Sequence, residues 1–220
     1  MPFKLLHPIK NKIYNQYQLI EFLISDFPDM QRLWHRKMEA IFRHEASEIS
    51  EGDKEIQISE FLQMSRLFEE QRDYNYFYNA MLILVFSYYE DLMISIHNNE
   101  FPNSLTDIIP KMSDFCNKKG ITLSSDSKDN VDFIYNKVRL LRNYIAHSKW
   151  GRQKNSPSDI ATIKSLEADY PDIHLDDNSI FLSGNTFLLD TLKKERAVLL
   201  ELSNKLGYTN KSTDNCTEKQ

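Results

Sequence analysis

The segment from Tyr74 to Asn98 constrains the fold most, because it is apolar on nearly every side of a helix instead of along one stripe. Its centre, Ala80–Tyr89 ("AMLILVFSYY"), is closed by Glu90 and Asp91. That run is far shorter than the roughly 18 to 20 residues needed to span a bilayer. A helix that is apolar all round belongs in the middle of a bundle. The segment therefore predicts the central helix of a helical bundle, with no membrane as partner.

Helical periodicity extends over most of the chain. It predicts helices over 11–25, 58–98, 104–118, 131–149, 158–170 and 186–206, and a further helix that begins at Pro28 with Asp26 as its N-cap. The helix over 58–98 has a break near Asp73, and Gly120 ends the helix over 104–118. The stretch "DIHLDDNSIFLS" predicts a hairpin of strands 172–175 and 179–182. Only 5 glycines argue against a many-turned all-β fold. We expect an all-α fold, a helical bundle with one small β-hairpin before the C-terminal helix.

The length of 220 residues suits one structural domain. Within it we expect N-terminal helices over 1–56, a helical bundle over 57–206 and a disordered tail over 207–220. Cys116 and Cys216 lie too far apart in the chain to indicate a disulfide framework or a zinc site. A signal-peptide pattern and a phosphate-binding Gly-rich loop are both absent from the sequence. We expect a cytoplasmic protein with no cofactor and no metal.

Positive charge is concentrated in one segment. The net charge of −5, from 27 basic and 32 acidic residues, argues on average against a nucleic-acid partner. From Asn136 to Asn155 there is no Asp or Glu, and there are six basic residues, Lys137, Arg139, Arg142, Lys149, Arg152 and Lys154. The other 21 basic residues against 32 acidic ones leave −11 for the rest of the chain. We therefore expect this strip to contact RNA or phosphate through Arg139, Lys149, Arg152 and Lys154.

The sequence "RNYIAH" lies near the end of the predicted helix 131–149. At about 100° per residue, Arg142, Asn143 and His147 share a polar arc of about 140° around the small Ala146. The opposite side is apolar and predicts a stripe that faces the core, made of Ile134, Val138, Leu141 and Ile145. The motif brings a guanidinium, an amide and an imidazole to one face, without a carboxylate in the segment to neutralise them.

Such side chains suit a phosphate group. Arginine presents a planar fork of donors to phosphoryl oxygens, and histidine exchanges protons near neutral pH. In RNA a 2′-hydroxyl lies beside the scissile phosphodiester, so an imidazole and a cationic clamp are sufficient for internal transesterification without metal. DNA lacks that hydroxyl. If the site is catalytic, Arg142, Asn143 and His147 therefore point to RNA cleavage.

The same residues allow less specific interpretations. In an arbitrary protein, an Arg and a His on one polar helix face more often form a solvated surface or a structural hydrogen-bond pair. Glu90 closes an apolar run, where an unpaired buried carboxylate is costly. We expect Glu90 to pair with Arg139 or Arg142 and to have a structural or positioning role instead of serving as a general acid.

The motif and its place resemble a HEPN domain (higher eukaryotes and prokaryotes nucleotide-binding). That family is an α-helical bundle marked by Arg, a polar residue most often Asn, three variable residues and His near the end of a late helix. Arg142, Asn143 and His147 fit this pattern. The stretch "VFSYYEDLMISI" resembles the long core helix of the family, and a hairpin followed by a helix occurs in several of its bacterial branches. The resemblance covers about residues 60–206.

The resemblance implies a metal-independent endoribonuclease, often a toxin or anti-phage effector, that works as a homodimer with two motif helices in one composite cleft. His147 would be general base or acid at the 2′-hydroxyl, Arg142 would stabilise the phosphorane-like transition state, and Asn143 would orient the imidazole or phosphate. The product would carry a 2′,3′-cyclic phosphate, and an antitoxin or defence protein is a possible partner. Lys149 departs from the branch paired with nucleotidyltransferase antitoxins, where Tyr often lies two residues after the His.

Three hypotheses follow for the function of the chain. The first is a HEPN-type endoribonuclease in toxin–antitoxin or phage defence. The second is a non-catalytic module of the same type that binds RNA, nucleotide or a partner protein through the basic strip. The third is a helical bundle with a purely structural role.

Overall fold

The computed structural model describes residues 7–45, 72–148, 157–176 and 179–208. The helices are α1 (Pro8–Glu45), α3 (Arg72–Glu100), α4 (Met112–Lys119), α5 (Ser125–Phe133), α6 (Arg139–Ser148), α7 (Pro157–Asp169) and α8 (Thr186–Lys205). A π-helical turn, η2 (Ile134–Val138), joins α5 to α6, and strands β1 (Ile173–Asp176) and β2 (Ser179–Leu182) form an antiparallel hairpin. The predicted all-α fold with one small hairpin before the C-terminal helix is confirmed.

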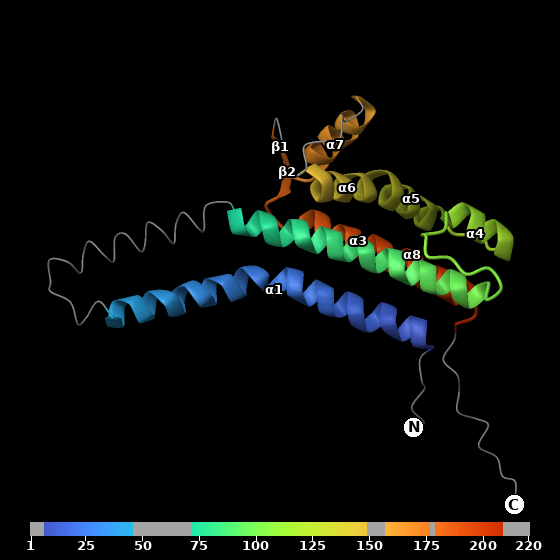
Figure 1. Ribbon diagram of the computed structural model, residues 1–220, viewed down its shortest axis with the longest axis horizontal. Helices are drawn as coiled ribbons and strands as arrows, with labels where there is room; N and C mark the ends of the chain where they lie inside the picture. Colours follow the sequence, from blue (N-terminus) through green and yellow to red (C-terminus); the bar gives the residue numbers. More distant parts are fainter. Residues whose placement is uncertain (1–6, 46–71, 149–156, 177–178, 209–220) are drawn as a thin grey trace, which may run out of the picture.

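Helix α3 occupies the middle of the bundle and contacts α1, α6, α8 and β2. Figure 1 shows α1 and α6 on opposite sides of it. Seven of its side chains have no exposed surface, namely Leu82, Val85, Phe86, Tyr89, Leu92, Met93 and Ile96. Within the described residues, Asn75–Glu100 is the one helical stretch long and apolar enough to cross a membrane by length and composition, and half of it is buried in the bundle. The prediction of a central helix is therefore confirmed.

Helix α1 differs from the two helices predicted on either side of Pro28. It is a single helix of 38 residues with Pro28 inside it. A proline costs about 3 kcal/mol in a helix interior, since it removes a hydrogen bond and clashes with the preceding turn. Packing offsets this cost, because Ile24 is fully buried and the Phe27 ring stacks on the Phe77 ring of α3 with centroids 3.4 Å apart. The prediction of a break at Asp26 is wrong.

The segment after α3 also differs from its prediction. Residues 104–111 are not helical, and α4 begins only at Met112. The Asn98 side chain donates to the Thr106 carbonyl and accepts from the Thr106 amide, both at 2.9 Å. This clamp holds the backbone out of a helix, and Pro110 offers no amide donor to one. Gly120 ends α4 in the left-handed conformation, at φ 65°, as predicted.

The helix that carries the motif starts earlier than predicted. Its first turn is at Ser125, in the stretch between the predicted helices 104–118 and 131–149. The Ser124 hydroxyl accepts from the Ser127 amide at 3.3 Å and so caps the helix. Ser124 also donates to Glu201 of α8 at 2.6 Å, which fixes the start of α5 against the C-terminal helix.

The C-terminal elements agree with the sequence to within a residue or two. Helix α7, both strands and α8 lie where the patterns place them. An unforeseen contact starts α8, because the Asp172 carboxylate from the loop before β1 accepts from the Phe187 amide at 3.1 Å. Tyr208, assigned by sequence to a disordered tail, is only 5% exposed and stacks on His7 with ring centroids 4.2 Å apart. The rest of the predicted tail, 209–220, lies outside the described residues.

Candidate functional site around Arg142

The π-helical turn η2 immediately precedes the motif helix α6. Ile134, Val138 and Leu141 are fully buried and Ile145 is 8% exposed, so the predicted core stripe is confirmed. These residues anchor the inner face of η2 and α6 against the bundle. A single π turn inserts an extra residue into a helix and is often found at functional sites.

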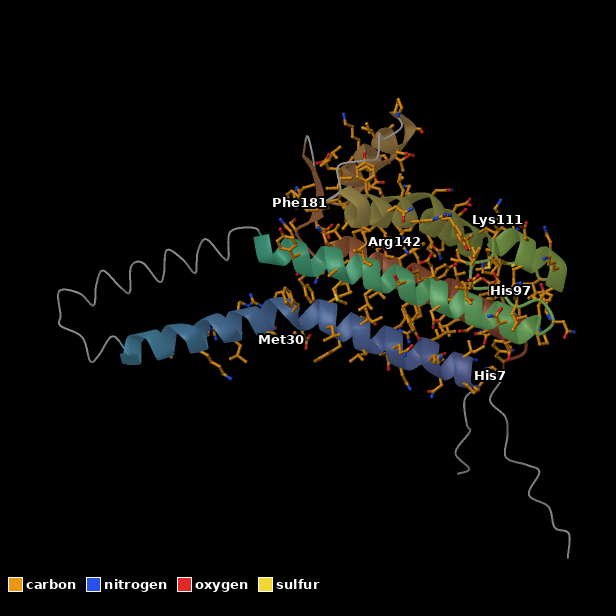
Figure 2. All side chains as sticks on the ribbon, viewed as in Figure 1. His7, Met30, His97, Lys111, Arg142 and Phe181 are labelled. Atoms are coloured by element: carbon orange, nitrogen blue, oxygen red, sulfur yellow. The ribbon has the colours of Figure 1, made fainter. Side chains whose placement is uncertain are left out.

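Arg142 is held between α6 and α3 (Figure 2). Its Nη2 donates to Glu90 Oε2 at 2.6 Å, and its Nη1 donates to Asn143 Oδ1 at 2.8 Å. The guanidinium carbon lies 5.0 Å from the centre of the Phe86 ring, one turn before Glu90 on α3. Both charged side chains are mostly covered, with 22% of Arg142 and 25% of Glu90 exposed. The Phe86 ring face below the guanidinium and the charge-assisted hydrogen bond to Glu90 together fix the orientation of Arg142.

This geometry confirms one expectation and corrects another. The predicted pairing of Glu90 with an arginine of the motif helix is confirmed, and the arginine is Arg142. The motif was expected to carry positive charge with no carboxylate to neutralise it, but α3 brings Glu90 to it from 52 residues away in the sequence. Two of the five guanidinium hydrogens are used, leaving one on each Nη, while the buried Nε has no acceptor among the described residues.

Asn143 and Arg139 lie beside the paired arginine. The amide oxygen of Asn143 accepts from Arg142, so it orients the guanidinium in this structure. Arg139 is exposed on the first turn of α6. Burial raises the pKa of Tyr135 to about 12, and the nearby charge of Arg139 opposes that rise. Arg139 is therefore close to the edge of the site and accessible to an anion.

The remaining predicted site residues fall at the end of the described part. His147 is in the last turn of α6, and its side chain lies outside the described ones. Its backbone is about 7.5 Å along the axis and 140° around the helix from that of Arg142. Lys149, Arg152 and Lys154 lie outside the described residues. Convergence of the guanidinium and the imidazole on one phosphate stays a prediction.

Sequence reasoning missed a buried acid behind the ion pair. Glu195 of α8 is completely buried, and its Oε2 accepts from the Tyr17 hydroxyl of α1 at 3.0 Å. Burial raises the pKa of Glu195 well above its ordinary value, the Tyr17 bond opposes this, and the charge of Glu90 adds to it. The sequence did contain a sign of this burial, because Glu195 is spaced three or four residues from Thr191, Leu192 and Val198, which are buried on the same helix face.

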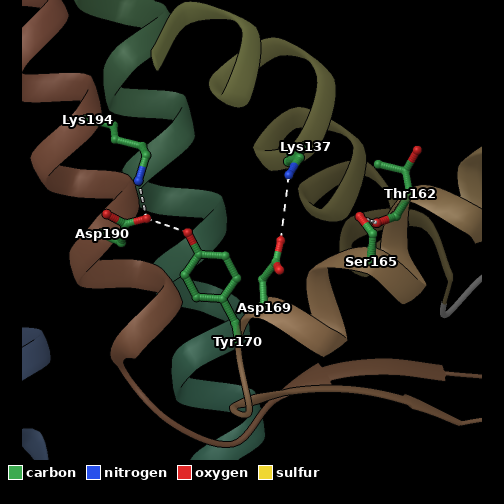
Figure 3. A network of polar contacts seen from close by, with 7 residues as sticks. All are labelled: Lys137, Thr162, Ser165, Asp169, Tyr170, Asp190 and Lys194. Carbon is green, nitrogen blue, oxygen red and sulfur yellow. Dashed lines mark hydrogen bonds and ion pairs between the residues drawn. The ribbon is translucent and has the colours of Figure 1, made fainter. Parts of the chain in front are cut away.

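Part of the basic strip is paired with acids from other elements. Lys137 of η2 lies 3.9 Å from Asp169 at the end of α7, as Figure 3 shows. Next to it, Asp190 of α8 accepts from the Tyr170 hydroxyl and pairs with Lys194. These contacts hold α7 and the hairpin against the bundle. Lys137 was counted in the basic strip, but its charge is partly offset in space.

Two hollows elsewhere in the described part of the chain are not lined by Arg142. One, of about 510 Å³, runs between α1 and α8 and is lined in part by Tyr17, Glu21 and Arg196. The second, of about 450 Å³, lies between α4 and α5 beside Cys116. Within the described ranges, no group of three or more His, Cys, Asp and Glu side chains could hold a metal ion.

Comparison with known proteins adds no relative to this description. No family model, no curated protein and no solved structure matches the chain. The motif and the geometry around Arg142 are therefore the features that bear on function.

Proposed function

We propose that this chain is a metal-independent endoribonuclease of the HEPN type, acting in the cytoplasm in toxin–antitoxin or phage defence. The observation that carries the proposal is the fixed Arg142, clamped by Glu90 and Asn143 over Phe86, five residues before His147 on the same helix. A preoriented guanidinium loses little conformational entropy when it binds a phosphate. The resemblance of "RNYIAH" to the family motif supplies the reaction.

In the proposed reaction His147 removes the proton from a ribose 2′-hydroxyl, and the 2′-oxygen attacks the adjacent phosphorus. The bond from phosphorus to the 5′-oxygen breaks, and that oxygen takes up a proton. The products are a 2′,3′-cyclic phosphate end and a 5′-hydroxyl end. Arg142 stabilises the charge on the phosphorane oxygens with its free Nη hydrogens, while Glu90 and Asn143 hold its plane. Arg139 and the basic residues after α6 bind flanking phosphates.

The proposed working unit is a homodimer in which two copies of α6 meet. One Arg and one His form a sparse site, and two-fold pairing doubles the groups around the substrate. An antitoxin or another defence protein is the proposed protein partner.

One observation favours a different function. Glu90 pairs with Arg142 at 2.6 Å, as it also would in a purely structural ion pair. The alternative is a non-catalytic module that binds RNA, nucleotide or a protein through Arg139 and the residues after α6. In that case RNA binds without turnover.

The two functions separate in one assay. The full chain is incubated with RNA in EDTA, and the new ends are mapped. We expect 2′,3′-cyclic phosphate ends with wild type, and a loss of at least about 100-fold in cleavage with His147→Ala, because a positioned acid–base group contributes about that much. Arg142→Lys should also reduce cleavage strongly, since lysine cannot form the two-sided clamp.

The matched control is His174→Ala, which removes a histidine of β1 that contacts Ser183 at 2.7 Å and is not part of the proposed site. It should cleave as wild type does. Equal cleavage by wild type and His147→Ala would show contamination and remove the proposal. Undiminished RNA binding without any cleavage by wild type would favour the non-catalytic alternative.

A further inference from the structure

The outward face of α1 carries an apolar stripe with no partner in the described part of the chain. Phe22, Met30 and Leu33 are 55%, 46% and 55% exposed, and Leu19 extends the stripe at 58%. Past Pro28, every side chain that the structure describes up to Ala40 is exposed. In Figure 1 this half of α1 reaches beyond the start of α3. Helices gain most of their stability from packing an apolar face, so such an arm favours a partner.

The order of residues along this face is self-complementary. At about 100° per residue, positions 22, 26, 30, 33 and 37 fall within an arc of about 80°. The series reads Phe22, Asp26, Met30, Leu33 and Lys37, and the sequence places Ile41 next. When a second copy of this series runs in the opposite direction, each apolar residue lies opposite an apolar residue, and Asp26 lies opposite Lys37. Neither Asp26 nor Lys37 forms an ion pair with another described residue.

We infer that α1 pairs antiparallel with α1 of a second copy of this chain. In that register Met30 of one copy packs on Leu33 of the other, and the two-fold axis passes between them. Asp26 of each copy lies opposite Lys37 of the other, on both sides of this apolar centre. Phe22 faces position 41. The contact extends over about 30 Å of helix. Isologous pairing explains why one stripe carries both halves of each ion pair.

This surface is separate from the candidate site. Helices α1 and α6 lie on opposite sides of α3 (Figure 1). The inference therefore does not rest on the proposed nuclease, and the pairing is measured without RNA. If α6 also forms the proposed dimer, the two contacts together give a tetramer.

A charge-reversal series tests the register in the full chain by sedimentation equilibrium. Asp26→Lys and Lys37→Asp should each weaken self-association about tenfold, because each single change puts like charges opposite at two places. The double variant should restore wild-type association, and so should an equimolar mixture of the two single variants. In a parallel pair each residue would lie opposite its own copy, so wild type and each single variant would all have like charges opposite at positions 26 and 37. Single variants that associate as wild type does would therefore overturn the antiparallel register.

Leu33→Asp tests the apolar centre, and Leu105→Asp is its control. Leu105 is a 72% exposed leucine in the loop after α3. Leu33→Asp should halve the mass of the assembly, whereas Leu105→Asp should leave it unchanged. Circular dichroism checks that both variants keep the helical content of wild type. A wild-type chain that stays monomeric, or an assembly of unchanged mass in Leu33→Asp, would overturn the inference and leave the proposed nuclease untouched.

Discussion

Two acidic side chains in this protein have opposite roles although they lie close to one another. Glu90 accepts a hydrogen bond of 2.6 Å from Arg142. Glu195 is fully buried, accepts one hydrogen bond from Tyr17, and forms no ion pair with another described residue. Ionising it would place a second negative charge near Glu90 inside the bundle. Burial therefore favours the neutral form of Glu195, and Glu90 is the carboxylate that orients Arg142.

Replacing Glu195 by Gln should change how stability depends on pH. The pKa of Glu195 is raised in the folded state, so its contribution is complete below its ordinary pKa and is lost as pH rises toward the folded pKa. Over that window the wild-type free energy of unfolding should fall by about 1.4 kcal/mol per pH unit from this group. Glu195→Gln should lack this slope. Urea unfolding from pH 5 to 8 measures it, and parallel curves for the two proteins would contradict a buried neutral acid.

The segment from α5 through η2 to α6 is one helical run that presents Arg142 to α3. Its start is fixed by Ser124, which caps α5 and binds Glu201 of α8. Burial acts to raise the pKa of Glu201, but hydrogen bonds from Ser124, Ser127 and Lys205 outweigh it and lower the pKa to about 2. Serine and aspartate before an apolar run are a known start signal for helices. The signal was present in "SSDSKDN", although the same composition also suits a loop.

Ser124→Ala should lower the free energy of unfolding by about 1 to 2 kcal/mol, because it removes both a helix cap and a bond to a carboxylate. The next residue supplies the control. Ser125 is exposed and its hydroxyl contacts only Asp126 among the described residues, at 3.4 Å. Ser125→Ala should therefore change stability by less than about 0.5 kcal/mol. Urea unfolding at neutral pH compares the two, and equal effects would show that the cap contributes nothing specific.

The two ends of the described chain close the bundle together. His7 stacks on Tyr208, and Lys10 donates to Asn204 at 2.9 Å. The Tyr208 hydroxyl donates to Glu100 at 2.7 Å and accepts from Asn99 at 2.8 Å, which ties both ends to the last turn of α3. These contacts join residues between 108 and 201 positions apart, so they stabilise the assembled bundle and not any one helix.

Truncation tests what Tyr208 contributes to the stability of the bundle. A chain that ends at Tyr208 should unfold at the same urea concentration as the full chain. A chain that ends at Leu206 should be less stable by at least about 2 kcal/mol, since it loses the buried ring and both hydrogen bonds. Thermal unfolding gives the same ranking. Equal stability of the two truncated chains would mean that Tyr208 adds nothing to the bundle.

The sequence alone determined most of the helical segments and the apolar face of the motif helix α6. The runs in α3 and α8 are long, and α7 is short but has clear ends, so local patterns were enough to place them. Pro28 and the stretch 104–111 were misjudged, because distant packing around Phe27 and the clamp between Asn98 and Thr106 decided their conformation. Local signals cannot report contacts that form only after the chain has folded.

The candidate site was likewise determined partly by the sequence and partly by the tertiary structure. The spacing of Arg142, Asn143 and His147 is a property of the sequence, and it supplied the chemistry of the proposal. Only the tertiary structure decided that Glu90 pairs with Arg142 and not with Arg139, that Phe86 lies under the guanidinium, and that Glu195 is buried behind them. Those partners come from α3 and α8, and their charges interact because packing removes the water that would screen them.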